Sequence, residues 1–300
     1  MTTREYDLVA IGGGTAGLVS AAGAAYLGVR PALVERRALG GDCLWTGCVP
    51  SKALIASARL AHAMRHADRL GLVSAAPKHA FAEVMERMRA ARHVVEHHDD
   101  PERFRGMGVD VHFGGARFVS EGEVEVEGVG RIRSDRFVLA TGAEPAVPPL
   151  PGLSEAGYLD HTTLFDIDTL PHRLTVLGAG PVGLEMAQVM ARLGSRVTVV
   201  EMEPRILPQD DPDVSERLLR ILEGEGIRFR LGARAEAVES GGGAKRVEVA
   251  RGAPVEGDEI LVATGRRPML EGLELERAGI RTENGAVRVD GRLRTSNKRV

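Results

Sequence analysis

Residues 6–17 read YDLVAIGGGTAG, and this stretch decides the fold. Its apolar half, Tyr6–Ile11, predicts a short buried strand. The spacing Gly-x-Gly-x-x-Gly follows directly, and an alanine-rich segment to about Gly28 predicts a helix. A second apolar strand, Pro31–Val34, ends at the acidic Glu35. A strand, a glycine turn, a helix and a strand in this order predict a doubly wound α/β fold.

Each glycine of this pattern has a separate task. Gly12 permits the tight turn, Gly14 lets a pyrophosphate approach the backbone, and Gly17 lets the helix and strand pack closely. The start of the helix offers free N–H groups and a partial positive charge to phosphate. Glu35, 18 residues after Gly17, can accept hydrogen bonds from ribose hydroxyl groups. The stretch therefore predicts a dinucleotide site.

The same pattern occurs a second time. Its first strand is Arg173–Leu177, and the three glycines Gly178, Gly180 and Gly183 follow. A helix then runs to about Leu193, and the second strand, Arg196–Val200, ends at the acidic Glu201. Each copy is later followed by an apolar strand ending in Ala-Thr-Gly, at Phe137–Gly142 and Ile260–Gly265. Such a strand fits a central strand that returns beside the first. Two copies in register predict two three-layer, Rossmann-like dinucleotide-binding domains.

The residues between these parts predict the remaining elements. They are helices at about Pro50–His66 and Phe81–Arg105, and short strands near Val109, Ala116 and Val124–Val126. Prolines at 145, 148, 149 and 151 form a natural linker and place a domain boundary near residue 150. A length of 300 residues also favours about two domains.

Composition excludes several classes of protein. A net charge of −3 argues against a nucleic-acid partner. The uncharged stretch Leu8–Val29 is long enough to imitate a membrane span, but glycines interrupt it and acidic residues precede it. We therefore interpret it as a strand, a turn and a helix. The expectation is a cytoplasmic protein with no membrane or nucleic-acid partner.

The motif GGDCLWTGCVPSK contains the only two cysteines of the chain. A zinc site needs further ligands, which only His62 and His66 could supply nearby, so we expect no metal. A structural disulfide is uncommon in a chain of this size without a secretory signal, and a pair of inert buried thiols is the plainer alternative. Cys48 stands near a predicted helix start with Lys52 one turn later, which favours a reactive thiolate. We interpret Cys43 and Cys48 as a redox pair.

Together these motifs resemble those of the class I pyridine nucleotide-disulfide oxidoreductases, the family of dihydrolipoamide dehydrogenase, glutathione reductase and mercuric reductase. The resemblance covers essentially the whole chain and implies FAD at the first glycine motif and NAD(P)H at the second. Asp42 stands where threonine is commoner, and with Trp45 it is most similar to bacterial members near mercuric reductase and dihydrolipoamide dehydrogenase. The implied reaction passes hydride between nicotinamide, flavin and the Cys43–Cys48 disulfide. Its substrate would be a small-molecule or lipoyl-type disulfide or dithiol.

The resemblance also implies roles for single residues. Cys48 would be the sulfur beside the flavin, and Cys43 the thiol that exchanges with substrate. Lys52 would lie beside flavin N5 and pair with Glu185, while Pro181 replaces a gating tyrosine of some members. The implied cofactor-binding residues are the motif glycines, Glu35, Lys52 and Glu201 already named, with Gly41, Asp42, Ala116, Thr141, Gly142 and Gly265.

Glu201 bears on the choice of nicotinamide cofactor. A carboxylate there accepts the 2′-hydroxyl of NADH and repels the 2′-phosphate of NADPH. Arg196 and Arg205 are near in the sequence and would weaken this preference. We expect NAD(H) to be favoured over NADP(H).

The sequence ends before parts that the resemblance implies, namely an Ala-Gly-Asp motif that binds flavin and a dimerisation domain with a His-Glu pair. We therefore expect a C-terminally truncated form of a homodimeric protein. The expected domains are an FAD-binding domain with the redox disulfide at 1–150, an NAD(P)-binding domain at 151–270, and an incomplete return segment at 271–300. After about residue 270 we expect partial disorder or association, with Val287, Val289 and Leu293 exposed.

Two other functions stay open from the sequence. One is NADH-dependent reduction of quinones or oxygen by the flavin alone, with the cysteine pair idle. The other is a nucleotide-binding fragment without catalysis. The presence of bound flavin would separate the second alternative from the enzymes.

Overall fold

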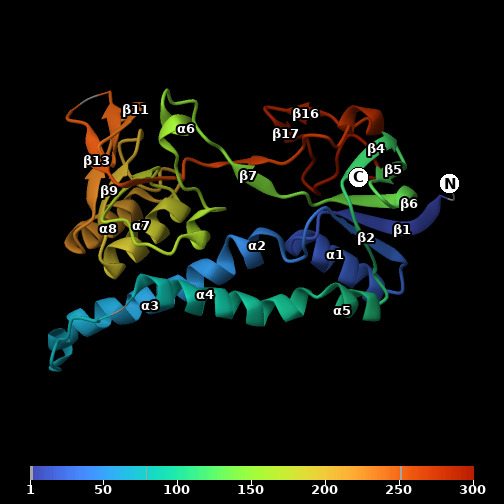
Figure 1. The fold of residues 1–300 in the computed structure, drawn as a ribbon. Helices are drawn as coiled ribbons and strands as arrows, with labels where there is room; N and C mark the ends of the chain where they lie inside the picture. Colours follow the sequence, from blue (N-terminus) through green and yellow to red (C-terminus); the bar gives the residue numbers. More distant parts are fainter. Residues whose placement is uncertain (1–2, 79, 251) are drawn as a thin grey trace. The chain divides into compact units, whose positions relative to one another are not determined.

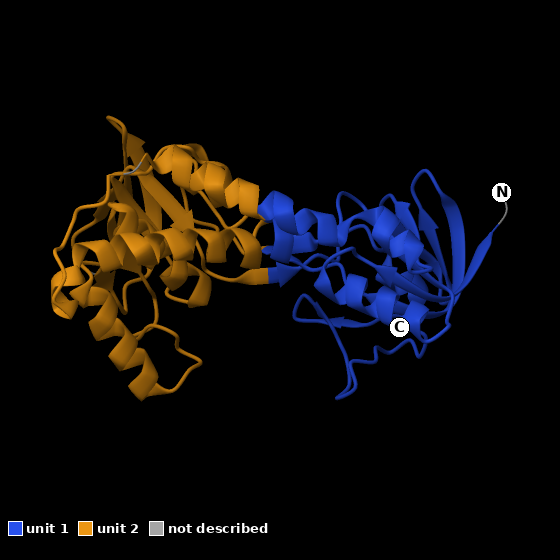
Figure 2. Ribbon diagram, turned by 90° about the horizontal axis from the view of Figure 1, so that it is seen from below, with its two compact units in different colours: residues 1–45, 92–144, 267–300 blue, residues 46–91, 145–266 orange. Residues whose placement is uncertain are grey.

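The computed structural model describes residues 3–78, 80–250 and 252–300. The chain divides into two compact units, each assembled from separate stretches (Figure 2). Unit 1 comprises residues 1–45, 92–144 and 267–300, and unit 2 comprises residues 46–91 and 145–266. The functional division at residues 150 and 270 groups the chain differently and stays a prediction.

Unit 1 is built around a six-stranded sheet with the order β3-β2-β1-β6-β5-β4. Figure 1 labels β1, β2, β4, β5 and β6 of this sheet. Its strands are β1 (Arg4–Ile11), β2 (Pro31–Glu35), β3 (Asp110–Phe113), β4 (Ala116–Ser120), β5 (Glu123–Val126) and β6 (Gly130–Leu139). The first three strands and β6 run parallel, whereas β4 and β5 join antiparallel. Its other elements are α1 (Thr15–Tyr26), α2 (Gly41–Trp45), the 3-10 helix η2 (His97–Asp99), α5 (Pro101–Gly106), η4 (Leu275–Ala278), β16 (Thr282–Glu283) and β17 (Ala286–Val287).

The sheet of unit 1 is buried on both faces. Successive residues of a strand point to opposite sides, so one strand contributes side chains to the core on each face. Val9 and Ile11 of β1 join one core cluster, and Ala10 joins the other. The cluster around Ala10 includes Leu18 of α1, so this helix covers one face. The opposite cluster takes in Phe118 of β4 together with residues after 270. A parallel strand buried on both sides explains why the second half of β1, residues 8–11, is a continuous apolar run.

Unit 2 contains a four-stranded parallel sheet with the order β10-β9-β8-β14 and a three-stranded antiparallel sheet with the order β11-β12-β13. The strands are β8 (Arg173–Leu177), β9 (Arg196–Val200), β10 (Arg228–Arg230), β11 (Ala235–Gly241), β12 (Ala244–Val249), β13 (Val255–Gly257) and β14 (Glu259–Val262). The helices are α3 (Cys48–Arg65), η1 (Ala67–Leu70), α6 (Leu153–Ala156), η3 (Leu164–Asp166), α7 (Pro181–Leu193) and α8 (Pro212–Gly224). Helix α4 (Phe81–Glu96) passes from unit 2 to unit 1 after Ala91. Strands β7 (Ala143–Pro145) and β15 (Arg266–Pro268) pair as a separate ribbon.

The parallel sheet of unit 2 also lies in the middle of three layers. Leu174 and Val176 of β8 pack in one cluster with residues of α3, α4 and α7. Leu177 packs in another cluster with Val247 of β12 and Val255 of β13. Helices therefore cover one face and the antiparallel sheet covers the other, as expected for an α/β fold of this class.

The strand pairing that the sequence repeat predicts is confirmed in both units. Strand β6 pairs in parallel with β1, and β14 pairs in parallel with β8, so each Ala-Thr-Gly strand returns beside the first strand of its motif. The amide of Ala140 donates to the oxygen of Ile11, and the amide of Ala263 donates to that of Leu177, both at 2.8 Å. Strands β8 and β9 have the predicted bounds.

The single helix predicted over Phe81–Arg105 is wrong. Helix α4 ends at Glu96, and α5 begins only at Pro101. Proline lacks the N–H that an internal helical position needs, and its fixed φ suits the first turn. The side chain of Asp100 accepts a hydrogen bond from the amide of Glu102 at 2.7 Å, which caps the new helix.

The partial disorder expected after residue 270 is also wrong for this segment, whereas the association expected there stays a prediction. Leu273, Leu275 and Ile280 are buried and belong to the core of unit 1, and Val287 packs against it. The amide of Phe118 donates to the oxygen of Leu273 at 2.9 Å. Val289 and Leu293 are exposed, as expected. Phe118 of strand β4 packs in the same cluster as this segment, and no feature of the sequence indicated this contact.

Across the described part of the chain, none of the helices has the length and apolar character needed to cross a membrane.

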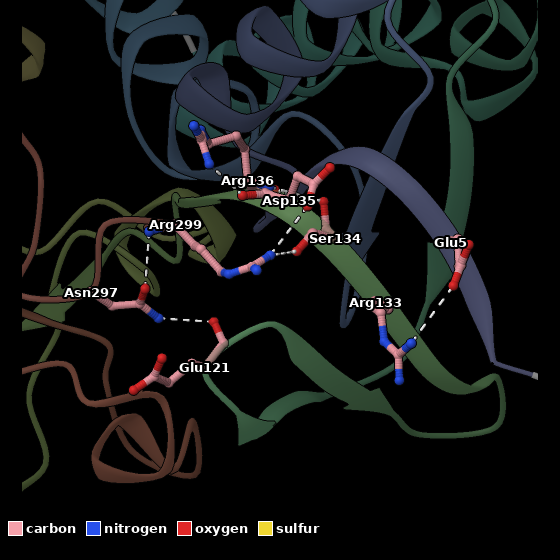
Figure 3. A network of polar contacts seen from close by, with 8 residues as sticks. All are labelled: Glu5, Glu121, Arg133, Ser134, Asp135, Arg136, Asn297 and Arg299. Carbon is pink, nitrogen blue, oxygen red and sulfur yellow. Dashed lines mark hydrogen bonds and ion pairs between the residues drawn. The ribbon is translucent and has the colours of Figure 1, made fainter.

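Asn297 fixes the last described segment to unit 1 (Figure 3). Its Nδ2 donates to the backbone oxygens of Glu121 and Ala278, both at 2.9 Å, and its Oδ1 accepts the amide of Arg299 at 2.9 Å. Arg299 in turn donates from Nη1 to the oxygen of Ser134 and pairs with Asp135 at 3.2 Å. Asn297 is only 8% exposed, so water has little access to this site and cannot easily replace the hydrogen bonds that its side chain makes.

We predict that Asn297→Ala lowers the free energy of unfolding by about 2–4 kcal/mol, because it leaves two carbonyls and an amide of a buried site without a partner. Urea denaturation measures the change. The exposed neighbour Lys298 provides the control, and Lys298→Ala should alter stability by less than about 0.5 kcal/mol. Equal effects of the two substitutions would contradict this account.

Candidate functional site: two glycine turns and a cysteine motif

The first glycine turn leaves no room for side chains at two positions. A Cβ on Gly12 would lie 2.1 Å from the oxygen of Ala140, and φ at Gly12 is +110°. A Cβ on Gly17 would lie 1.8 Å from the oxygen of Gly12. The turn, the helix and the returning strand β6 therefore meet at backbone distance, which glycine alone permits.

Gly14 differs from these two glycines, because the space beside it is open. A Cβ on Gly14 would meet only the Cα of Gly41, at an ordinary 3.7 Å. Gly14 is also the N-cap of α1 and makes no side-chain capping bond. Helix N-termini of this kind hold free amides and a partial positive charge, which suit an anionic group. These features fit the pyrophosphate of a dinucleotide.

The carboxylate of Glu35 holds the glycine turn in place. Its Oε2 accepts the amide of Gly13 at 2.6 Å, and its Oε1 accepts the amide of Arg37 at 2.7 Å. Each carboxylate oxygen has a further acceptor site, so these bonds leave capacity for a ribose hydroxyl. Glu35 thus has a structural role in the turn that the sequence pattern did not indicate.

The second turn repeats this geometry in unit 2. A Cβ on Gly178 would lie 2.5 Å from the oxygen of Ala263, and one on Gly183 would lie 2.3 Å from the oxygen of Gly178. A Cβ on Gly180, the N-cap of α7, would meet nothing within 4 Å. The second site is therefore as open at its central glycine as a bound pyrophosphate requires.

Glu201 repeats the arrangement of Glu35 in a more buried position. Its Oε2 accepts the amide of Ala179 at 2.7 Å, and its Oε1 accepts that of Glu203 at 2.9 Å. Only 9% of Glu201 is exposed. The charge is thus fixed at the tip of β9 by two backbone amides, and its position does not depend on a flexible side chain.

The two cysteines lie in different elements and in different compact units. Cys43 is half-buried within α2 of unit 1, whereas Cys48 is exposed and begins α3 of unit 2. Both are thiols in this structure. Gly47 is the N-cap of α3 and makes no side-chain capping bond, so the first amides of the helix lie next to Cys48.

Lys52 and Glu185 form the ion pair that the resemblance implied. Lys52 Nζ lies 3.2 Å from Glu185 Oε2 and 3.4 Å from Oε1. Lys52 is on the first turns of α3, and Glu185 is on the first turns of α7. Their side chains are 61% and 43% exposed, so the pair contributes little to stability.

The remaining predicted residues are divided between the ends of two central strands, helix α2 and the edge strand β4. Thr141 and Gly142 follow β6, and the oxygen of Gly142 accepts the amide of Met269 at 3.1 Å. Gly265 follows β14, and its oxygen accepts the amide of Ala146 at 3.0 Å. Asp42 is in α2 next to Gly41, whose Cα approaches Gly14. Ala116 is half-buried at the start of β4, in the antiparallel part of the sheet.

A half-buried charge cluster lies where α3 approaches α7, and sequence reasoning missed it. Glu225 accepts hydrogen bonds from Arg192 at 2.7 and 2.6 Å and from Gln188 at 3.0 Å. His62 of α3 lies 4.0 Å from the same carboxylate. The imidazole of His62 stacks on that of His66 at 4.2 Å, and the described residues hold no group of three or more metal-ligating side chains. The only sequence signal was the i, i+4 spacing of the two histidines.

Two pKa values in this cluster depart from their usual ranges. Burial lowers the pKa of His62, although Glu225 opposes the shift. Burial would raise the pKa of Glu225, but the hydrogen bond and charge of Arg192 outweigh it and hold that pKa below its usual range. Glu225 is therefore ionised in the folded protein and is bound by Arg192 of α7, while the lowered pKa of His62 favours a neutral imidazole beside it.

The profile of the family described as "Pyridine nucleotide-disulphide oxidoreductase" matches residues 6–300. A mercuric reductase of Bacillus cereus is 34% identical over 300 residues, covering 99% of this chain and 47% of that protein. Dihydrolipoyl dehydrogenase 3 of Pseudomonas aeruginosa is 39% identical over 298 residues, which cover 93% of this chain and 62% of that protein. The solved HOCl-induced flavoprotein disulfide reductase RclA of Escherichia coli aligns with a TM-score of 0.86 at 30% identity, over 98% of this chain and 64% of that one. The chain thus spans about half to two-thirds of these relatives, and the match supports FAD as a cofactor.

We predict that Glu225→Gln lowers the free energy of unfolding at pH 7 by about 1.5–3 kcal/mol, because Arg192 loses its charged partner. The folded pKa of Glu225 lies below the unfolded value, so its contribution is complete above about pH 5 and is lost as the pH falls. Denaturation at several pH values measures the difference between wild type and variant.

The exposed Glu223, two residues earlier, provides the matched control, and Glu223→Gln should show no such pH dependence. A stability difference for Glu225→Gln that persists unchanged at pH 3 would contradict this assignment.

Proposed function

We propose that this chain, which belongs to the pyridine nucleotide-disulphide oxidoreductase family, is the nucleotide-binding part of an FAD-dependent NAD(P)H:disulfide oxidoreductase. The observation that carries the proposal is the pair of glycine turns, each closed at its outer glycines and open at Gly14 or Gly180. The two turns differ in their surroundings, because Gly14 faces Gly41 at the start of the cysteine motif, whereas Gly180 faces open space. We assign FAD to unit 1, which holds Cys43, and the nicotinamide cofactor to the turn in unit 2.

FAD, when bound, supplies a two-electron relay between a nicotinamide and the cysteine pair. The chain's own residues then carry the sulfur chemistry. The Cys43 thiolate attacks one sulfur of a substrate disulfide, forms a mixed disulfide and releases the first substrate thiolate. The Cys48 thiolate then attacks Cys43, which closes the Cys43–Cys48 disulfide and releases the second thiolate. In the direction of dithiol oxidation the same bonds form and break in reverse.

The Lys52–Glu185 pair supports this assignment, because both groups are exposed to a ligand. A cation at Lys52 can stabilise negative charge that develops beside it, and Glu185 keeps the lysine oriented. The proposed substrate class is a disulfide or dithiol, and the name of one relative, dihydrolipoyl dehydrogenase, suggests a lipoyl group. The name mercuric reductase suggests mercuric ion as a different kind of substrate. The homodimer implied by the resemblance stays a prediction.

We predict that Cys43→Ser and Cys48→Ser each abolish NADH-dependent reduction of a disulfide substrate, because a single thiol cannot complete the exchange. The flavin content of the purified protein should not change. Thiol titration of the oxidised, denatured wild type should find no titratable thiol, and that of each variant should find one. Two titratable thiols in air-oxidised, active wild type would contradict the proposal.

We propose further that NAD(H) is preferred, because Glu201 holds a buried charge at the tip of β9. Glu201→Gln should raise the affinity for NADPH relative to NADH roughly five- to tenfold, since one close like-charge contact costs about 1 kcal/mol in water. Equilibrium titration with both cofactors measures the ratio.

Glu35→Gln is the matched control, because Glu35 makes the same two backbone bonds in unit 1. It should leave the NADH-to-NADPH ratio unchanged. A wild-type protein that binds NADPH more tightly than NADH would refute the preference.

A further inference from the structure

Trp45, the only tryptophan of the chain, lies between the two cysteines and ends α2. Its Nε1 donates a hydrogen bond to the backbone oxygen of Leu39 at 2.8 Å. This bond joins the end of α2 to the segment that precedes it, so the turn that carries Cys43 is closed on itself. Leu44 within the turn is 1% exposed and anchors it in the protein interior.

Arg92, on α4, holds Trp45 from a second direction. Its guanidinium carbon lies 5.5 Å from the centre of the indole ring, within the range of a cation–π contact. Its Nη1 also donates to the backbone oxygen of Trp45 at 3.4 Å. The last carbonyls of a helix lack intrahelical partners, and a cation placed there stabilises the helix end. Arg92 thus contacts both the ring and the backbone of one residue.

Cys43 lies two residues before Trp45 and is half-buried, whereas Cys48 is exposed. The contacts that hold Cys48 are of a different kind. The amide of Ser51 donates to the oxygen of Gly47 at 3.0 Å, and the hydroxyl of Ser51 donates to the oxygen of Cys48 at 3.3 Å. Loosening Trp45 therefore changes the surroundings of Cys43 and leaves the helical start at Cys48 in place.

We propose that Arg92 is a positioning residue that acts through Trp45 and sets the accessibility of Cys43. The inference deepens the proposed function, because it rests on Cys43 being the thiol that meets the substrate. A thiolate attacks a disulfide only when its sulfur is presented along the S–S axis, and a fixed α2 turn presents Cys43 in one orientation. Arg92 contributes to that orientation without contacting the substrate.

The test uses the full chain, purified with its cofactor and fully reduced with dithiothreitol, which is then removed. Alkylation by iodoacetamide is followed by mass spectrometry at each cysteine separately. Arg92→Gln removes the cation and the guanidinium fork, and should raise the alkylation rate of Cys43 roughly three- to tenfold, since the two contacts are worth about 1 kcal/mol. The rate at Cys48 should not change. A general loss of stability would raise both rates and so would contradict the proposal.

Trp45→Phe provides a second variant, because it removes the bond to Leu39 while keeping an aromatic ring. It should give the same selective increase at Cys43, and adding Arg92→Gln to it should give little more. Arg92→Lys, which keeps the charge, should restore part of the protection. Arg103→Gln is the matched control, since Arg103 is a cation on the next helix, α5, and donates to the backbone oxygen of His98. It should leave both rates as in wild type.

An unchanged Cys43-to-Cys48 ratio in both Arg92→Gln and Trp45→Phe would overturn the inference. Because the assay uses reduced protein, it does not depend on whether the pair cycles through a disulfide. Failure of the proposed function would appear separately, as a wild-type pair that air does not oxidise and that NADH does not protect from oxidation. Tryptophan emission gives an independent readout, because a released Trp45 should shift to longer wavelength in Arg92→Gln and keep its wild-type position in Arg103→Gln.

Discussion

The structure depends on one steric constraint, which is that a strand, a helix start and a returning strand meet at backbone distance. At Gly12 the nearest atom to a hypothetical Cβ is the backbone oxygen of Ala140, and at Gly178 it is that of Ala263. Backbone cannot move aside as a side chain can, so a methyl group at either place would force the sheet apart. This contact places the start of α1 over β1 and the start of α7 over β8. The open amides at these helix starts follow from the same constraint.

The same device serves two sites that differ in their surroundings. In unit 1 the open glycine faces Gly41, so the cysteine motif abuts the turn, whereas Gly180 of unit 2 faces open space. The acid that closes each turn is partly exposed at Glu35 and buried at Glu201. Both acids are tied to two backbone amides, so the two sites differ in how deeply the acid is buried, and this difference is the basis of the proposed preference for NAD(H).

Much of this arrangement could be predicted, because the deciding contacts are local. Strands β8 and β9 have the predicted bounds, and the Ala-Thr-Gly strands pair where the repeat placed them. The rest depends on contacts between distant residues. Asn297 reaches Glu121 across 176 positions, and Arg92 reaches Trp45 across 47. No period or motif marks such residues, since a buried asparagine or a cation over a ring is recognisable only when the fold has brought its partners together.

For the helix predicted over Phe81–Arg105, by contrast, a local signal was present in the sequence and was not used. Its apolar period is continuous enough to suggest a single element, but Asp100 and Pro101 carry a stronger local signal for a new start. A proline at the first helical position preceded by a capping acid should have outweighed the period. The burial of Leu273 and Ile280 was missed for another reason, because their partner strand β4 is over 150 residues away.

The central claim, that each open glycine receives a pyrophosphate, is tested most directly by Gly14→Ala and Gly180→Ala. Both positions have negative φ (−81° and −76°), and an added Cβ would meet nothing closer than 3.7 Å, so neither substitution should disturb the fold. Bound flavin and the dissociation constant for NADH are measured on both variants. The account predicts that Gly14→Ala loses flavin, and that Gly180→Ala retains flavin but binds NADH at least roughly tenfold more weakly, because a methyl group displaces a backbone-to-phosphate contact. Normal flavin content in Gly14→Ala together with wild-type NADH affinity in Gly180→Ala would contradict it.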